Sequence, residues 1–192
     1  AYATEVFLDQ VAASAGADPL AFRLALLEHH PRHAAVLKLA AEKAGWGKPL
    51  AKGRFLGLAV HESFHTFVAH VAEVSVSGGE VKVHRVVAAV DCGTVVNPNV
   101  VKAQIEGGTG FGLGAILAEE LTLGADGMVE QGNYDSYTPL PDMEVHIVAS
   151  DAPPTGVGEP GVPSIGPAVA SAVARATGKW ITTLPLTRGM QS

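Results

Sequence analysis

One carboxylate lies in a loop built largely from residues that fix the backbone. Residues 156–164 contain three glycines, two prolines and a single acid, Glu159, and an Ala- and Val-rich helical pattern follows directly. Gly permits close backbone approach and Pro stiffens the connections between bends, so this loop can hold Glu159 rigidly beside a helix N-terminus. From composition alone two interpretations stay open: a catalytic acid, or an ordinary strand-to-helix connection whose Glu complements the helix dipole.

Gln104 lies in a predicted helix that is unusually rich in glycine. Asn97 and Pro98 mark the start of this helix, which runs to about residue 117. A Gln side chain offers a donor and an acceptor together, which suits a polar heterocyclic cofactor, although a solvent-facing Gln is the alternative. Each interior Gly costs roughly 0.5–1 kcal/mol relative to Ala, so close helix packing or a ligand against the backbone must offset the cost. The glycines are Gly107, Gly108, Gly110, Gly112 and Gly114.

A second candidate site matches the H-E-x-x-H pattern of zinc hydrolases, through His61, Glu62 and His65. That chemistry requires both histidines on one helical face, one turn apart, with the Glu beside the water that zinc activates. The motif lies between two strand patterns here, and Val68 and Val71 occupy the places where the extended pattern has Gly and His. A zinc-dependent hydrolase is therefore the less favoured alternative.

Two further side chains carry potentially reactive atoms but are not interpreted as catalytic nucleophiles. Ser164 does not fall in the G-x-S-x-G pattern of nucleophilic serines, and its hydroxyl is expected to cap the last helix or to bind a phosphate at the helix N-terminus. Cys92 follows a strand pattern and is interpreted as structural. As the one cysteine, it excludes an internal disulfide and any Cys-based zinc or iron–sulfur site within the chain.

The composition is that of a globular chain whose surface is partly covered by other protein. Of the 192 residues, 47% are hydrophobic and only 17% are charged, against roughly 25% in typical domains. The net charge of −6 argues against a nucleic-acid partner. No apolar run approaches the roughly 18 residues of a membrane span, and no signal peptide opens the sequence. We expect a fragment or a subunit.

The helix and strand patterns of the sequence predict an α+β fold with mostly antiparallel strand pairing, and this fold must position the candidate residues. Residues 1–50 are expected to be a helical segment, and residues 51–192 an α+β unit built from hairpins and the Gly-rich helix. In the first helix, Val6, Phe7, Val11 and Ala15 are expected to form the buried stripe. Helices are predicted at about 4–15, 19–28, 32–44, 98–117 and 167–177, and strands at 55–60, 67–76, 80–90 and 143–149, with a hairpin at 120–131 and an extended tail at 181–186.

Five short motifs occur in an order that resembles one enzyme family. They resemble the C-terminal part of the molybdenum-binding subunit of the xanthine dehydrogenase/aldehyde oxidase family, in the branch of the isoquinoline 1-oxidoreductase β-subunit and related bacterial aldehyde dehydrogenases. Each motif alone is weak, but the ordered set is specific and covers almost the whole chain. The motifs are Val90-Asp91-Cys92-Gly93, Val96-Asn97-Pro98, Gln104-Ile105-Glu106-Gly107-Gly108, Gly112-Leu113-Gly114 and Gly156-Val157-Gly158-Glu159-Pro160.

The resemblance implies that Glu159 is the general base beside molybdenum, in the oxidation of an aldehyde or N-heterocycle with oxygen derived from water. Burial is expected to make this carboxylate a stronger base. The cofactor would be a molybdopterin cytosine dinucleotide that holds the metal through its pterin, with no direct metal ligand from this chain. Electrons would leave through a small partner subunit with [2Fe-2S] clusters, toward a cytochrome or another acceptor. The residues implied to contact the cofactor are Gln104, Gly107, Gly108, Gly158 and Ser164.

The same resemblance implies that the site is incomplete. Family members carry a further Gly/Gln-rich cofactor loop and an Arg-containing substrate loop upstream, and neither occurs in this sequence. They also have several more residues between the positions of Leu140 and Pro141, so either this loop is shorter here or residues are missing at this point, and this wall of the substrate pocket stays open. The rest of the molybdenum subunit is therefore an expected partner. A non-catalytic structural or assembly module of such a complex is the alternative, and the sequence assigns neither a substrate nor a compartment.

Overall fold

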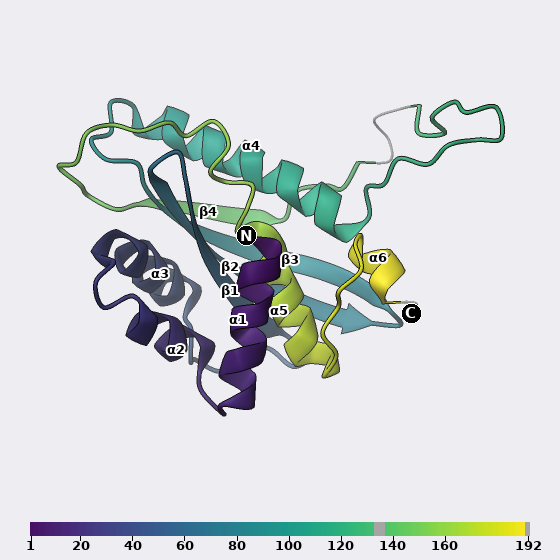
Figure 1. The fold of residues 1–192 in the computed structure, drawn as a ribbon, viewed down its shortest axis with the longest axis horizontal. Helices are drawn as coiled ribbons and strands as arrows, with labels where there is room; N and C mark the ends of the chain where they lie inside the picture. The colour runs from purple at the N-terminus through teal and green to yellow at the C-terminus, as the bar shows by residue number, and fades with distance from the viewer. Residues whose placement is uncertain (133–136, 191–192) are drawn as a thin grey trace.

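A computed structural model describes residues 1–132 and 137–190 of the chain as helices packed on a four-stranded sheet (Figure 1). The strand order follows the sequence, β1-β2-β3-β4. The helices are α1 (Tyr2–Ser14), α2 (Pro19–Leu26), α3 (Pro31–Ala44), α4 (Pro98–Leu117), α5 (Ile165–Thr177) and α6 (Leu186–Gly189), and the strands are β1 (Phe55–Ser63), β2 (Thr66–Ser77), β3 (Glu80–Asp91) and β4 (Asp142–Ile147).

Two tight hairpins and one crossover build the sheet. β1 pairs with β2 and β2 pairs with β3, both antiparallel, whereas β4 joins β3 in parallel after the chain has passed through α4. A parallel neighbour needs such a long crossover connection, because its start lies at the same end of the sheet as the start of β3. The predicted α+β class with mostly antiparallel pairing is confirmed.

Both faces of the sheet are covered, which explains the nearly continuous apolar strands. Alternate residues of β2 point to opposite faces: Ala69 and Val71 belong to the cluster that contains Val36 and Leu37 of α3. Ala72 and Val74 belong to the cluster formed with α4 and α5. At Gly57 of β1 the helix α5 crosses so closely that a Cβ atom would lie 2.1 Å from the Ala168 carbonyl oxygen, so only Gly fits there.

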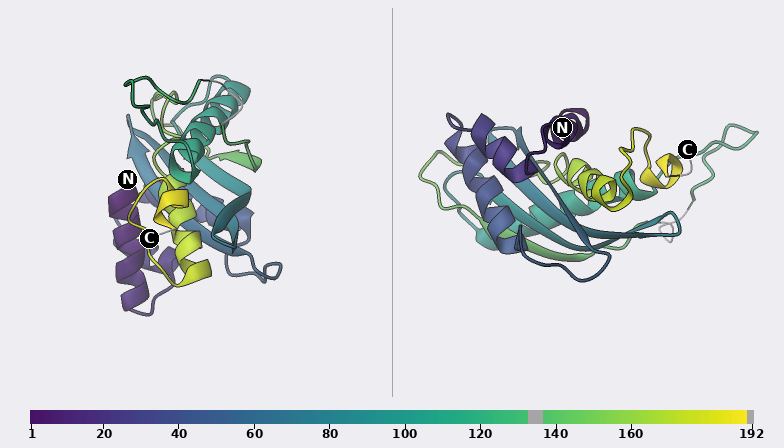
Figure 2. Two further views of the ribbon diagram at one scale, coloured as in Figure 1. Left: turned by 90° about the vertical axis from the view of Figure 1, so that its right-hand side faces the viewer. Right: turned by 90° about the horizontal axis from the view of Figure 1, so that it is seen from below.

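The predicted buried stripe of α1 is wrong in part. Val6 is buried, but Phe7 and Val11 are exposed, and the residues that face inward are instead Glu5 and Asp9. Both carboxylates bind the buried guanidinium of Arg23 in α2. The Glu5 side chain also accepts the backbone N–H of Val60 on the edge strand β1 at 3.0 Å. A buried ion cluster thus replaces the apolar contact that the sequence pattern predicts. α1 lies beside α5 (Figures 1 and 2).

Two other predicted elements differ from the structure. The hairpin expected at 120–131 consists of a turn and a single bridge between Leu123 and Val129, without strands. The extended tail expected at 181–186 leads into the short helix α6. In the part of the chain that the structure describes, no helix has the length and apolar character required to cross a membrane.

Candidate functional site

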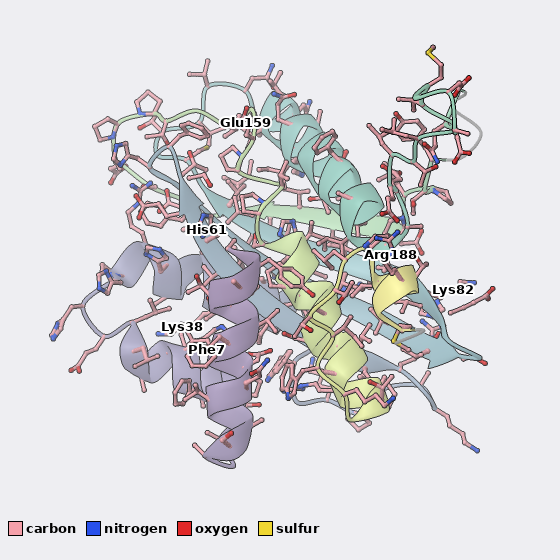
Figure 3. All side chains as sticks on the ribbon, turned by 45° about the vertical axis from the view of Figure 1, so that its right-hand side comes forward. Phe7, Lys38, His61, Lys82, Glu159 and Arg188 are labelled. Atoms are coloured by element: carbon pink, nitrogen blue, oxygen red, sulfur yellow. The ribbon has the colours of Figure 1, made fainter. Side chains whose placement is uncertain are left out.

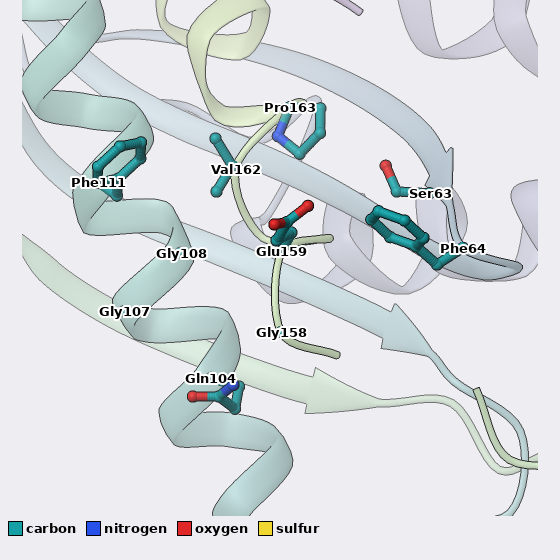
Figure 4. A pocket seen from close by; sticks show the side chains of 10 residues that line it. All are labelled: Ser63, Phe64, Gln104, Gly107, Gly108, Phe111, Gly158, Glu159, Val162 and Pro163. Atoms are coloured by element: carbon teal, nitrogen blue, oxygen red, sulfur yellow. The ribbon is translucent and has the colours of Figure 1, made fainter. Parts of the chain in front are cut away.

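Three segments that are distant in sequence enclose a pocket of about 600 Å³ (Figure 4). They are the turn between β1 and β2, one face of α4, and the loop 156–164 that precedes α5. Asn97 caps α4, its side chain accepting the backbone N–H of Asn99 at 3.0 Å, as predicted for the start of this helix. The lining residues are Ser63, Phe64, Gln104, Gly107, Gly108, Phe111, Gly158, Glu159, Val162 and Pro163.

Glu159 and Gln104, the two polar candidates from the sequence, line the same pocket (Figure 4). The structure brings the loop against α4 at this point: a Cβ atom on Gly158 would lie 3.9 Å from the Gln104 amide nitrogen. Both side chains are exposed, so the burial expected for Glu159 is not provided by the described part of this chain. In Figure 3 the Glu159 side chain lies near the start of α4, far from Arg188.

The glycines of α4 and the loop separate into two groups. A Cβ on Gly108 would meet Gly161 at 3.3 Å, and a Cβ on Gly161 would lie 2.7 Å from the Ile105 carbonyl oxygen, so these two glycines allow the loop to pack directly on the helix. Gly107 is different, because nothing in the described residues lies within 4 Å of a Cβ placed there. Its bare backbone faces the pocket, as does that of Gly158.

Two aromatic lining residues were missed by the sequence analysis. Phe64 and Phe111 are 65% and 75% exposed, which is unusual for side chains of this size and apolarity. Phe111 lies seven residues after Gln104, which places both on one face of α4 and is the signal that could have identified it. Phe64 has a φ of +55° and His65 a φ of +62°, so the two form the centre of a tight turn in a conformation that non-glycine residues rarely adopt.

Ser164 lies at the end of the loop but does not reach the pocket. Its hydroxyl makes no cap hydrogen bond to α5, so the predicted capping is wrong. Instead the hydroxyl is fully buried and lies 2.8 Å from Nδ1 of His70 on β2. The Nε2 atom of His70 lies 2.9 Å from the Thr109 hydroxyl of α4. Burial lowers the pKa of His70 to about 3, so the ring is neutral at physiological pH.

The zinc pattern does not have the geometry that zinc chemistry needs. His61 and Glu62 are successive residues of strand β1, so their side chains point to opposite faces, and His65 is in the turn. The Glu62 carboxylate lies 3.5 Å from Nδ1 of His65 and 3.9 Å from Nε2 of His33. The described residues contain no group of His, Cys, Asp and Glu suited to a metal ion. The less favoured alternative, a zinc-dependent hydrolase using His61, Glu62 and His65, therefore lacks the geometry that it requires.

The segment at Leu140 and Pro141 leads directly into β4. Leu140 lies over Gly110, where an added Cβ would come within 2.4 Å of its side chain. Leu140 is not among the residues that line the pocket. This segment therefore packs on α4 without contributing to the pocket wall.

The chemistry of the pocket wall fits one part of a molybdopterin-type cofactor. An amide, a carboxylate and bare helix backbone surround a space open to a flat polar heterocycle, and Phe64 and Phe111 supply aromatic surface. No Lys or Arg occurs among the ten lining residues, so the phosphates of a dinucleotide would be held elsewhere. Gln104, Gly107, Gly108 and Gly158, which the resemblance implies as cofactor contacts, are all among the residues that line this pocket.

Comparisons with known proteins identify the family of the chain. The family described as "Molybdopterin cofactor-binding domain" matches residues 27–145. The chain is 40% identical over 96% of its length to the isoquinoline 1-oxidoreductase subunit beta of Brevundimonas diminuta, and 35% identical over its full length to a membrane-bound aldehyde dehydrogenase of Gluconacetobacter polyoxogenes. It spans only 25% and 29% of the length of these two relatives.

The fold is also similar to that of solved enzymes. The crystal structure of quinoline 2-oxidoreductase from Pseudomonas putida 86 superposes with a TM-score of 0.55 and 28% identity, over 66% of this chain and 19% of that one. The similarity therefore concerns one portion of a larger protein. The chain belongs to the molybdopterin cofactor-binding domain family, within the molybdenum-binding subunits of the xanthine dehydrogenase/aldehyde oxidase group.

Proposed function

We propose that this chain forms part of the large subunit of a molybdenum hydroxylase, in which Glu159 is the general base. The observation that carries the proposal is the convergence of Glu159, Gln104 and the bare backbone of Gly107 on one pocket. An interior helical Gly is unfavourable, and Gly107 has no packing partner among the described residues that would explain its presence. A cofactor lying against α4 supplies that explanation.

The cofactor proposed here is molybdenum bound to molybdopterin cytosine dinucleotide, which when bound would supply the redox centre for the transfer of oxygen and two electrons. The residues of this chain would hold and orient it. The side-chain amide of Gln104 offers two N–H donors and one carbonyl oxygen acceptor to the polar edge of the heterocycle. Gly107, Gly108 and Gly158 allow it to approach the backbone. Phe64 and Phe111 would offer aromatic surface on either side of the carboxylate.

Glu159 would accept the proton released when oxygen derived from water attacks the substrate carbon. In the net reaction an aldehyde and water give a carboxylic acid, two protons and two electrons; an N-heterocycle gives the ring-hydroxylated product with the same balance. A carboxylate is suited to this because it is ionised at neutral pH and hydrogen-bonds the nucleophile before taking its proton. The substrate classes are proposed from relatives named for isoquinoline, quinoline and aldehyde oxidation.

The pocket is open in this chain, so the rest of the site must come from outside the described residues. The proposed partners are the remaining part of the molybdenum subunit and a small subunit with [2Fe-2S] clusters that passes electrons to a cytochrome or another acceptor. The low fraction of charged residues in the sequence and the exposed side chains of Phe64, Val96 and Phe111 support such coverage.

The test is Glu159→Gln in the purified complex, with Glu106→Gln as the matched control. Glu106 lies on α4 but does not line the pocket. We expect Glu159→Gln to lower kcat by at least about 100-fold, in the range found for positioned general bases, while the molybdenum content stays the same. Glu106→Gln should retain activity. Full activity of Glu159→Gln would refute the catalytic assignment and favour a non-catalytic structural module.

A further inference from the structure

The loop that carries Glu159 is fastened to β2 at its first residues. The Thr66 hydroxyl is buried and donates to the Gly156 carbonyl oxygen at 2.7 Å. The Thr66 hydroxyl oxygen also lies 2.6 Å from the hydroxyl oxygen of Thr155. Because the Thr66 proton is used by Gly156, Thr155 is the donor in this second bond. One hydroxyl of β2 thus binds both the first residue of the loop, Gly156, and the residue before it, Thr155.

The end of the loop is fastened to the same strand through His70. Thr109 donates its proton to the Ile105 carbonyl oxygen at 2.7 Å, so it accepts from Nε2–H of His70. The other ring nitrogen, Nδ1, then carries no proton and accepts from the Ser164 hydroxyl at 2.8 Å. This chain of hydrogen bonds joins β2 to α4 and to the last residue of the loop, and each of its side chains is buried.

Thr66 and His70 lie on one face of β2, because residues four apart in a strand point the same way. They are separated by about 13 Å along the strand, which sets the span between the two ends of the loop. Between these anchors, Pro160 and Gly161 are buried and Gly161 presses on the backbone of α4. Glu159 itself is exposed, so its position depends on the backbone that carries it.

We propose that Thr66 and His70 are positioning residues for Glu159: together they hold both ends of its loop against β2 and α4. This inference rests on the proposed role of Glu159 as general base. A general base must lie within hydrogen-bond reach of the proton that it takes, and a displacement of about 1 Å can lower a rate by about 100-fold. Neither residue lines the pocket, so neither touches the cofactor or substrate.

The first experiment uses Thr66→Val and Thr66→Ser in the purified complex. Valine keeps the shape of the side chain but removes the hydroxyl, whereas serine keeps the hydroxyl. We expect kcat of Thr66→Val to fall by about 10- to 100-fold with KM and molybdenum content unchanged, and Thr66→Ser to restore most of the rate. Amide hydrogen exchange of residues 156–162 should become faster in Thr66→Val, while exchange in α1 stays the same.

The second experiment tests the other anchor with His70→Gln and a matched serine pair. Ser164→Ala removes the hydroxyl bound to His70, and Ser75→Ala removes a hydroxyl that lies 2.7 Å from Nε2 of His84, a strand histidine remote from the loop. His70→Gln and Ser164→Ala should lower kcat and speed exchange in residues 161–164. Ser75→Ala should change neither.

The outcomes separate this inference from the proposed function. If Glu159→Gln is inactive but Thr66→Val and His70→Gln keep the full kcat, the positioning role is wrong. The role is also wrong if their rates fall only in proportion to lost molybdenum or lost folded protein, because that result describes a general structural effect. If Glu159→Gln stays active, the proposed function fails, and the exchange measurements alone then decide whether the loop is anchored as described.

Discussion

Arg32 holds both carboxylate oxygens of Asp91, with 2.7 Å from Nε to Oδ2 and 2.7 Å from Nη2 to Oδ1, and so joins α3 to the end of β3. The guanidinium also lies over the ring of Phe67, 4.3 Å from its centroid. Burial raises the pKa of Asp91, but hydrogen bonds from Arg32 and from the Gly93 amide outweigh it, so the pKa lies below its ordinary value. The pair stabilises the fold at neutral pH.

Arg32→Met is expected to lower the free energy of unfolding by about 2–4 kcal/mol at pH 7, because it leaves the Asp91 carboxylate buried without its partner. Thermal unfolding at pH 7 and at about pH 3, which is below the ordinary Asp pKa of about 3.9, measures this change in free energy. A carboxyl with a lowered pKa contributes stability that is present above its unfolded value and is lost as the pH falls through the folded value. The difference in the free energy of unfolding between Arg32→Met and the unmodified protein should therefore become smaller toward acid pH. Lys38→Met, an exposed position on the same helix, should change little at either pH.

His70→Gln is expected to change how stability depends on pH. The folded ring protonates only near pH 3, whereas the unfolded ring protonates near 6.5, so the unfolded state binds more protons between these values. Stability from the neutral ring is full above about pH 6.5 and falls by up to about 1.4 kcal/mol per pH unit toward pH 3. The unfolding midpoint of His70→Gln should decline less steeply over this range. Equal slopes would contradict the buried neutral histidine.

Gly107→Ala separates helix stability from cofactor binding. An added methyl group meets nothing within 4 Å in the described residues, so α4 should gain about 0.5–1 kcal/mol from the better helix propensity of Ala. If a cofactor lies against this backbone, the molybdenum content or kcat should nevertheless fall. Gly110→Ala, whose methyl group would meet only the Leu140 side chain, is the control. A Gly107→Ala protein with unchanged molybdenum and kcat would contradict contact at this position.

Phe64→Asn is expected to affect stability and substrate binding in different ways, because it relieves the backbone strain of the turn but removes an aromatic ring from the pocket. Asn tolerates positive φ better than Phe, so the substitution should leave stability unchanged or raise it by about 1 kcal/mol. The loss of aromatic surface should raise KM for the aldehyde or N-heterocycle more than it lowers kcat. His65→Asn relieves the same conformation without changing a pocket residue, so its KM should stay constant. A KM unchanged in Phe64→Asn would place the substrate elsewhere.

Local signals in the sequence predicted most of the helices and strands, since caps and periodicity depend on neighbouring residues. Asn97 and Pro98 marked α4, and Gly45, with a φ of +75°, ended α3 where expected. The inward face of α1 could not be predicted, because Glu5 and Asp9 are buried only through Arg23 of another helix. The pairing of β4 likewise depends on a crossover that no local pattern records.

The same distinction applies to the candidate site. Glu159 and Gln104 were found from composition and resemblance, and the structure places both at one pocket. Phe64 was hidden in a pattern that indicated zinc, because a two-residue turn of non-glycine residues has no sequence signature. Ser164 was assigned to the cofactor from its place before a helix, but its hydroxyl is bound to His70, a partner 94 residues away.

The hydrogen bond from the Val60 amide to the Glu5 carboxylate affects whether another molecule can add a strand to the edge of the sheet. β1 is an edge strand, and an open edge presents backbone donors to which a strand of another molecule can add. Here the buried carboxylate of Glu5 in α1 occupies one such donor, so a strand that adds at this point would have to displace it. Addition of a strand along this part of β1 would therefore leave the buried Glu5 carboxylate without one of its hydrogen-bond donors.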